Sequence, residues 1–329
     1  MSRPISILPL GHRPVKELVV VSGKGGTGKT SLVASFATLA HNAVIADCDV
    51  DAADLHLLLG PRVVHREQFV GGKRARINAE QCVACGNCGA LCQFDAIGPD
   101  GPGNGSVQNT FRVDPIACEG CGVCAWFCPE GAIEFAPVVN GEWSISETRF
   151  GPMVHAKLGI AEENSGKLVS IVRTNAKQTA EESGADIVII DGPPGIGCPA
   201  IASITGTDMA LIVTEPTLSG LHDLDRVADL ARHFDVPVAV CVNKWDLAPQ
   251  ISDYIEAKVI KEGMTMVGRV RYDRSVTEAQ VQGMTIVEFR QDASAADVRQ
   301  VWTRLAKCLS LETRSSRDRP DLLRQSRNC

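Results

Sequence analysis

The sequence predicts an α/β protein built on a parallel β-sheet, with a second, smaller α+β domain inserted into it. Short, uninterrupted apolar runs alternate with helical stretches along most of the 329 residues, which is typical of a sheet covered by helices on both faces. A glycine-rich loop joins the first apolar run to the first helical stretch. Between residues 62 and 139 this order gives way to a segment rich in Cys, Gly and Pro, and it resumes afterwards.

The elements of the main domain follow from the spacing of apolar residues. Strands are expected at residues 18–21, 44–46, 187–190, 209–213, 238–242 and 266–270. Helices are expected at residues 30–40, 166–182, 219–234, 249–262 and 298–309. The chain therefore divides into an N-terminal extension (1–16), a discontinuous main domain (17–61 and 141–311), an inserted domain (62–140) and a polar tail (312–329).

Composition narrows the function classes. The net charge of −6 gives no general attraction to a polyanion, so we expect no nucleic-acid partner. Apolar runs stay below the roughly 18 residues of a membrane span, and the N-terminus has no long apolar signal segment. We therefore expect a cytoplasmic protein without a stable membrane anchor. In such a compartment, the 13 cysteines favour metal binding over disulfides.

The glycine-rich loop fits the G-x-x-x-x-G-K-[ST] pattern between a strand and a helix. Its glycines let backbone N–H groups surround phosphate oxygens, and the helix N-terminus adds a positive end. The side chain of Lys29 is expected to reach the β- and γ-phosphates, and the hydroxyl of Thr30 is expected to ligate Mg²⁺. The predicted nucleotide-binding residues of the loop are Gly23, Lys24, Gly25, Gly26, Thr27, Gly28, Lys29 and Thr30.

Three features resemble the MinD/ParA/Mrp superfamily, the SIMIBI-type P-loop NTPases with a deviant Walker A loop. They are the second lysine, Lys24, the Asp47-Cys48-Asp49 sequence after the second strand, and the Asp191-Gly-Pro-Pro-Gly sequence after a later one. The resemblance implies that Lys24 contacts phosphate across an ATP-dependent homodimer. It also implies that Asp49 positions the attacking water, Asp47 supports the metal shell and Asp191 holds Mg²⁺ through water.

The base that the site reads is a separate question. Residues 243–246 read N-K-x-D, which is similar to GTPases, where the aspartate reads guanine. In MinD-like ATPases an asparagine here faces adenine. Lys24 favours ATP and places Asn243 at the base edge, whereas Asp246 leaves GTP as an alternative.

The inserted segment contains two C-x2-C-x2-C-x3-C runs that start 36 residues apart, the spacing of two-cluster bacterial ferredoxins. Structural zinc, which prefers two separated ligand pairs, is the alternative. The resemblance assigns one [4Fe–4S] cluster to Cys82, Cys85, Cys88 and Cys128. It assigns the second to Cys118, Cys121, Cys124 and Cys92.

The five other cysteines have weaker assignments, and one of them, Cys329, is the terminal residue. Cys48 and Cys241 lie in or beside apolar strands and are expected to pack as small apolar residues. Cys198 lies near the position of a bridging-cluster ligand in nitrogenase iron proteins, but the chain lacks the second cysteine that such a cluster needs. We therefore expect Cys198 to be a packed or redox-idle thiol. Cys308 is expected in the last helix.

Together, these motifs resemble MinD-superfamily ATPases with an inserted ferredoxin domain, over residues 17–309. Residues 151–159 and 163–169 also look typical of that group. The resemblance implies an ATPase whose dimerisation gates electron transfer or binding of a redox or cofactor-assembly partner by the two clusters. A cluster carrier of the Mrp type and a spatial-positioning ATPase of the MinD/ParA type are the alternatives. The positioning alternative would need a membrane-binding or DNA-binding element, and residues 312–329 form no amphipathic face of that kind.

Overall fold

The main sheet has nine strands, in the order β11-β10-β9-β1-β8-β2-β7-β6-β3. The computed structural model describes residues 14–159 and 165–311, so most of the predicted extension and the whole predicted tail lie outside the described residues. The seven strands from β11 to β7 are parallel to one another. They are β1 (Lys16–Ser22), β2 (Ala43–Asp47), β7 (Gly151–Leu158), β8 (Ile187–Pro194), β9 (Met209–Thr214), β10 (Val238–Asn243) and β11 (Thr265–Val270).

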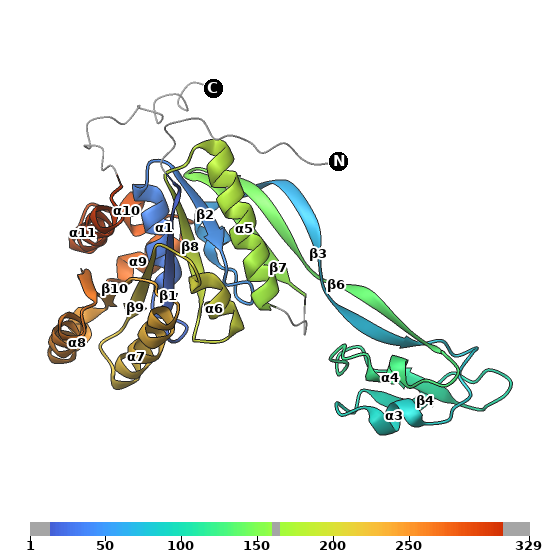
Figure 1. Ribbon diagram of the computed structural model, residues 1–329. Helices are drawn as coiled ribbons and strands as arrows, with labels where there is room; N and C mark the ends of the chain where they lie inside the picture. Colours follow the sequence, from blue (N-terminus) through green and yellow to red (C-terminus); the bar gives the residue numbers. More distant parts are fainter. Residues whose placement is uncertain (1–13, 160–164, 312–329) are drawn as a thin grey trace.

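Helices cover both faces of this sheet (Figure 1). Successive residues of a strand point to opposite faces, so Val19 and Val21 of β1 enter one apolar core while Leu18 and Val20 enter the other. The first core is closed by α5 (Ser165–Ser183), α6 (Cys198–Ile204), α7 (Leu218–His233) and α8 (Pro249–Lys261). The second is closed by α1 (Lys29–Leu39), α2 (Leu55–Leu59), α10 (Ile286–Phe289) and α11 (Ala293–Cys308).

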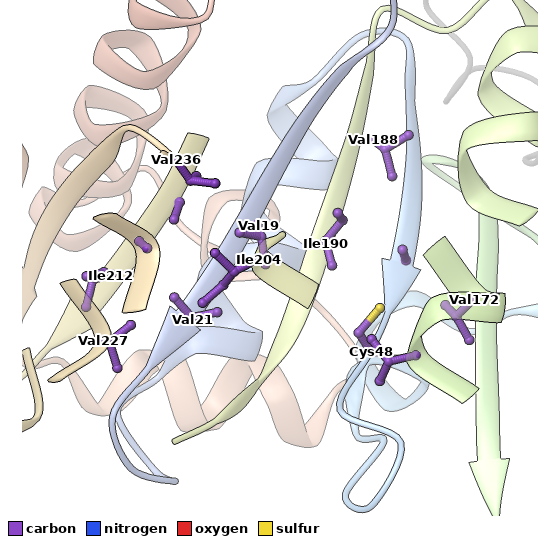
Figure 2. Close-up of a cluster of buried hydrophobic side chains, with 14 of the residues drawn as sticks. Val19, Val21, Cys48, Val172, Val188, Ile190, Ile204, Ile212, Val227 and Val236 are labelled. Atoms are coloured by element: carbon purple, nitrogen blue, oxygen red, sulfur yellow. The ribbon is translucent and has the colours of Figure 1, made fainter. Parts of the chain in front are cut away.

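Figure 2 shows the first core at close range. Ile204 of α6 lies over Val19 and Val21 of β1, and Val172 of α5 lies beside Cys48, just past the end of β2. All five side chains are fully buried. Cys48 and Cys241 are both at 0% exposure and pack as apolar residues, as predicted.

The predicted α/β main domain is confirmed, and each expected strand and helix is present. The largest shift is in α11, which begins at Ala293 instead of residue 298. Asp292 precedes it as the N-cap, and its carboxylate accepts a hydrogen bond from the Ala295 backbone N–H at 3.2 Å. An acidic cap of this kind satisfies an otherwise unpaired donor of the first turn. The short helix α9 (Arg274–Val281) was not predicted.

Two long antiparallel strands, β3 (Arg62–Ile77) and β6 (Ile133–Thr148), were also not predicted. Their halves nearest the main domain extend the sheet, because β6 pairs with β7 from Thr148 back to Gly141. β3 and β6 pair with each other along their whole length, and beyond Gly141 the pair projects away from the main domain (Figure 1). We call this projecting pair the arm.

The arm carries a small cysteine-rich module, residues 78–132, at its far end (Figure 1). The module contains α3 (Asn87–Leu91), β4 (Ile97–Gly101), β5 (Thr110–Val113) and α4 (Val123–Trp126). The 36-residue repeat of the sequence recurs in its backbone, where positive φ angles pair Ala84 (55°) with Gly120 (64°), Gly86 (82°) with Gly122 (77°) and Asp95 (50°) with Gly131 (60°).

Within the two described stretches, no helix has both the length and the apolar character needed to cross a membrane.

Candidate nucleotide and cysteine sites

The glycine-rich loop lies between β1 and α1, at the carboxyl edge of the central strands. Two of its glycines have positive φ angles, 79° at Gly26 and 86° at Gly28, which favour glycine. A Cβ at Gly28 would also lie 2.4 Å from Nδ2 of Asn243. That amide, at the end of β10, donates a hydrogen bond of 2.7 Å to the Thr27 carbonyl. This hydrogen bond therefore fixes the loop to the end of β10.

The ammonium of Lys29 lies between two carboxylates. Its Nζ is 2.9 Å from Oδ1 of Asp191 and 3.4 Å from Oδ2 of Asp49. Burial opposes the charged form of Lys29, but the attraction of Asp191 and its hydrogen bond outweigh burial and raise the lysine pKa. Lys29 therefore stays charged, and it neutralises part of the acidic site.

Asp47 is the third carboxylate of this cluster, because β2 and β8 pair in a register that sets Asp47 beside Asp191. Oδ1 of Asp47 accepts a hydrogen bond from the Asp49 backbone N–H at 3.2 Å, whereas its Oδ2 is buried without a hydrogen-bond partner. Burial, followed by the charge of Asp191, raises the Asp47 pKa well above its ordinary value. Burial also raises the pKa of Asp49.

The donor chemistry of this group suits a divalent cation. Asp49 and Asp191 contact the ammonium of Lys29, Asp47 lies beside Asp191, and one buried oxygen of Asp47 lacks a hydrogen-bond partner. Such oxygens are the donors that Mg²⁺ prefers. The hydroxyl of Thr27 is likewise buried without a partner.

A cavity of about 650 Å³ opens beside the loop, within the range of about 300–1,000 Å³ for small-molecule sites. The predicted residues on its wall include the loop from Gly25 to Thr30, Asp49 and Asn243. Asp246 does not line it, and the Asp246 carboxylate accepts a hydrogen bond of 2.7 Å from the Tyr272 backbone N–H. Residues 270–273 form part of the wall near Asn243.

Lys24 belongs to a polar group that the sequence did not reveal. Its Nζ lies 3.3 Å from Oε2 of Glu215 and 3.5 Å from Oγ of Ser219. Glu215 also pairs with Lys244, whose Nζ donates to the Gly26 carbonyl at 3.1 Å. The Glu215 pKa is lowered, because its bonds to the two lysines outweigh its partial burial. The sequence feature that could have identified Glu215 as a site residue is its position directly after β9, the strand next to β1.

The eight cysteines of the module line two separate cavities. Four of them surround one cavity with Ile77 and Phe111, namely Cys82, Cys85, Cys88 and Cys128. The other four surround the second cavity, namely Cys92, Cys118, Cys121 and Cys124. In each set, three thiols come from one run and the fourth comes from the other run.

The chemistry of these cavities suits a thiolate-ligated cluster. All eight thiols are free. Burial, followed by neighbouring thiols of the same run, raises the pKa of Cys88 and, 36 residues on, of Cys124. Clustered sulfur donors in a mostly apolar lining match [4Fe–4S] ligation. In the described part of the chain, no three Cys, His, Asp or Glu side chains are placed to hold a single metal ion.

Cys198 lies apart from both cavities. It is exposed at the first position of α6. Cys308 is also exposed, at the end of α11.

A second large cavity, of about 710 Å³, lies at the base of the arm. Its wall includes Asp51 and His56 from the segment after β2, and Arg66, Glu142 and His155 from β3, β6 and β7. The same segment lines the nucleotide cavity through Asp54, Leu57 and Leu58. Residues 50–58 thus form a wall shared by the two cavities.

Known proteins resemble this chain in sequence and in fold. The sequence model of the CobQ/CobB/MinD/ParA nucleotide binding domain matches residues 18–286. An uncharacterised protein of Methanocaldococcus jannaschii, MJ0578, is 36% identical over 240 residues, which are 70% of this chain and 78% of the relative. The pyruvate synthase subunit PorD of Thermotoga maritima is 36% identical over 64 residues, 20% of this chain and 59% of that subunit.

Two solved structures share the fold. A chain of the MinC:MinD cell division complex of Aquifex aeolicus has a TM-score of 0.54 at 17% identity, over 89% of this chain and 96% of that one. The septum site-determining protein MinD of Pyrococcus horikoshii, solved with Mg-ADP, has a TM-score of 0.53 at 16% identity, over 89% and 97%.

Proposed function

Because the chain belongs to the family of CobQ/CobB/MinD/ParA nucleotide-binding domains, we propose that it is an ATPase that couples its nucleotide state to two [4Fe–4S] clusters. In this proposal, ATP binding and hydrolysis alter electron transfer, or the binding of a redox partner, by the cysteine-rich module.

The nucleotide half of the proposal rests on the loop and the acidic cluster. Lys29 would release Asp191 and Asp49 and contact the phosphates of ATP. Thr30, Asp47 and Asp191 would hold Mg²⁺, which neutralises charge on the phosphates when bound. Asp49 would orient the attacking water. The Mg-ADP complex of the Pyrococcus horikoshii protein supports this choice of ligand.

ATP is favoured over GTP by the surroundings of Asp246. A carboxylate that reads guanine must face the base, but the Asp246 carboxylate is engaged by the Tyr272 N–H and is not part of the cavity wall. Asn243 is part of that wall and remains the proposed contact to adenine.

The cluster half rests on the two cysteine quartets. Cys82, Cys85, Cys88 and Cys128 would hold one cluster, and Cys92, Cys118, Cys121 and Cys124 the other. The clusters, when bound, supply one-electron carriers. Ala84, Gly86, Gly120 and Gly122 have the positive φ angles that let the chain wrap closely around a cluster.

The proposed coupling between the nucleotide site and the module rests on one observation, the wall that the two large cavities share. Residues 50–58 contact the nucleotide cavity on one side and the base of the arm on the other. The segment follows Asp49 directly and leads into β3, which carries the module. A shift of this segment on nucleotide exchange would therefore reach the arm over a short path.

The test uses the reciprocity of linked equilibria. We expect the anaerobically purified chain to hold about eight iron and eight sulfide. Its ATP affinity is then measured with the clusters oxidised and reduced, and its reduction potential with ATP and with ADP. Each tenfold difference in affinity must appear as a shift of about 59 mV for a one-electron couple.

Three variants control this test. Lys29→Ala should keep the clusters and lose the ATP-induced shift in potential. Cys85→Ser and Cys121→Ser occupy equivalent repeat positions and should each lose about half of the iron. Equal potentials with ATP and ADP, in a chain that holds both clusters, would refute the coupling.

The carrier alternative makes a different prediction. Rapid handover of the clusters to an apo-ferredoxin would favour a carrier, whereas retention over many electron-transfer cycles would favour the proposal. ATP-dependent pelleting with liposomes or DNA would favour a positioning ATPase.

A further inference from the structure

The two halves of the cysteine-rich module differ on one helix face. Val123, Trp126 and Phe127 lie at positions i, i+3 and i+4 around α4, so they share a face. Trp126 is 88% exposed and Phe127 63% exposed. Large apolar side chains grouped on a surface mark interaction sites.

The internal repeat provides a built-in comparison. The positions 36 residues earlier are Asn87 for Val123, Ala90 for Trp126 and Leu91 for Phe127. Asn87 and Ala90 are exposed as well. The repeated backbone therefore forms with a polar or small residue at the first two positions, and folding of the module does not account for the apolar side chains on α4.

The face also lies close to both cysteine cavities. Trp126 and Phe127 are two of the three residues between Cys124, which lines one cavity, and Cys128, which lines the other. A protein seated on α4 would thus bring its own redox centre near either cluster. Figure 1 shows the module at the end of the arm, away from the helical layers of the main domain.

The charge of the module indicates the surface charge of a protein that would dock on it. Residues 78–132 contain one basic residue, Arg112, which pairs with Asp100. The same residues contain six acidic ones, which are Glu80, Asp95, Asp100, Asp114, Glu119 and Glu130. Glu119 and Glu130 lie on the walls of the two cavities, and bound clusters with thiolate ligands would add further negative charge. Interfaces join surfaces of opposite potential.

We infer that the α4 face is the docking surface for a redox protein whose apolar pocket receives Trp126 and whose rim is basic. The redox role of this partner rests on the proposed function. Exposed tryptophans that enter such pockets dominate binding energy. The net negative charge of the module steers the encounter and makes it sensitive to salt.

The test places the photo-reactive residue p-benzoylphenylalanine at position 126 of the full-length holoprotein. A matched protein carries it at Tyr254, which is 60% exposed on α8 of the main domain. Both are irradiated anaerobically in extract of the source organism, and adducts are identified by mass spectrometry. The captured protein is then purified, and its affinity for wild-type, Trp126→Ala and Tyr254→Ala chains is measured at low and high salt.

We expect a single basic redox protein at position 126 that is absent at position 254. Trp126→Ala should weaken its binding about tenfold or more, and salt should weaken wild-type binding. Tyr254→Ala should leave it unchanged. Trp126→Ala installs the residue that the repeat has at position 90, so iron and sulfide content should match wild type.

Three results would overturn the inference. They are adducts that do not differ between the two positions, an adduct with a second copy of this chain, and a partner whose affinity does not depend on Trp126. Failure of the proposed function has a different signature, namely a chain without iron and sulfide, or potentials that do not respond to ATP, with Trp126-dependent docking intact.

Discussion

At the scale of single residues, Lys29 is the clearest link between the fold and the nucleotide chemistry. Its side chain is 6% exposed, and its ammonium contacts Asp191, whose side chain is 1% exposed. Removing one partner of a buried ion pair leaves an uncompensated charge, which costs about 3–5 kcal/mol. We therefore expect Lys29→Ala to lower the free energy of unfolding of the nucleotide-free chain by about 3 kcal/mol, and to abolish ATP binding. Urea denaturation followed by circular dichroism measures the first effect.

Lys24→Ala is the matched control for that measurement. Lys24 is in the same loop, but its side chain is 39% exposed beside Glu215. Solvent-exposed ion pairs contribute about 0–1 kcal/mol. A loss in Lys24→Ala equal to that in Lys29→Ala would show that the buried cluster is not the cause.

The nucleotide-site contacts differ in how far they follow from sequence. The meeting of Lys29, Asp49 and Asp191 follows from the loop pattern and from the carboxyl ends of neighbouring strands. The bond from Asn243 to the Thr27 carbonyl does not, because it depends on the distance between β10 and the loop. Glu215 was missed for the same reason: its two lysine partners come from the loop and from beyond β10, and no local spacing joins them.

His155 gives the chain a dependence of stability on pH. Burial lowers the His155 pKa below 6.5, and nearby His56 and Arg66 lower it further against the opposing charge of Glu142. The unfolded chain then binds more protons than the folded chain as the pH falls below 6.5, so stability is lost on acidification. Because the ring is partly open to solvent, which screens charge, this loss is smaller than for a fully buried histidine.

The test compares unfolding free energies at about pH 7.5 and about pH 5.5. His155→Gln keeps a polar group next to Ser146, whose hydroxyl lies 2.8 Å from the histidine Nε2, but it cannot titrate. Its stability should fall less than that of the wild type over this interval. An identical fall in both proteins would assign the effect to other groups.

At the scale of elements, the apolar content of each strand determined whether the strand could be predicted from the sequence. β1, β8, β9 and β10 are almost wholly buried, so their apolar runs are unbroken and identify them. β3 is exposed along its first seven residues, so that half of the strand has no buried face to impose alternation. Its partner β6 lies far along the chain, and pairing at that separation leaves no local signal.

Close packing of backbone against backbone fixes the turns of the cysteine-rich module. A Cβ at Gly120 would lie 2.2 Å from the Lys73 carbonyl oxygen, whereas one at Gly131 meets nothing within 4 Å. Both glycines have positive φ angles, so alanine strains either position by about 1–2 kcal/mol. Gly120→Ala adds the overlap, which costs a further ~1–3 kcal/mol.

We therefore expect Gly120→Ala to lose iron and sulfide, and Gly131→Ala to keep most of both. Ala84, at the repeat position of Gly120, has a φ of 55°, so alanine itself tolerates the backbone conformation. Equal cluster content in the two variants would show that the contact with Lys73 does not limit the fold of the module.

At the scale of the whole molecule, the arm joins two functional units without a flexible linker. β6 pairs with β7 of the main sheet at one end and begins directly after the module at the other. The segment from 50 to 58 touches both large cavities before it enters β3. A paired ribbon is stiffer than a single chain, so in the proposed mechanism a change at its base would move the module as one body. This geometry favours a gating role over a tethered, independently diffusing ferredoxin.

The assembly state provides the last test, because Lys24 can serve two roles in turn. In this structure Lys24 pairs with Glu215 and contacts Ser219. In the ATP-dependent homodimer that the family resemblance implies, Lys24 would leave both and reach a phosphate bound to the other copy. We expect Lys24→Ala to bind ATP within about threefold of wild type, since Lys29 provides the in-chain contact, and to remain monomeric. Sedimentation velocity with ATP and Mg²⁺ measures the dimerisation, with Lys29→Ala as the variant that loses ATP binding and dimerisation together.

A dimer of Lys24→Ala as tight as that of the wild type would place the dimer contact elsewhere. The nucleotide-dependent shift in cluster potential would then have to arise within one chain, through residues 50–58.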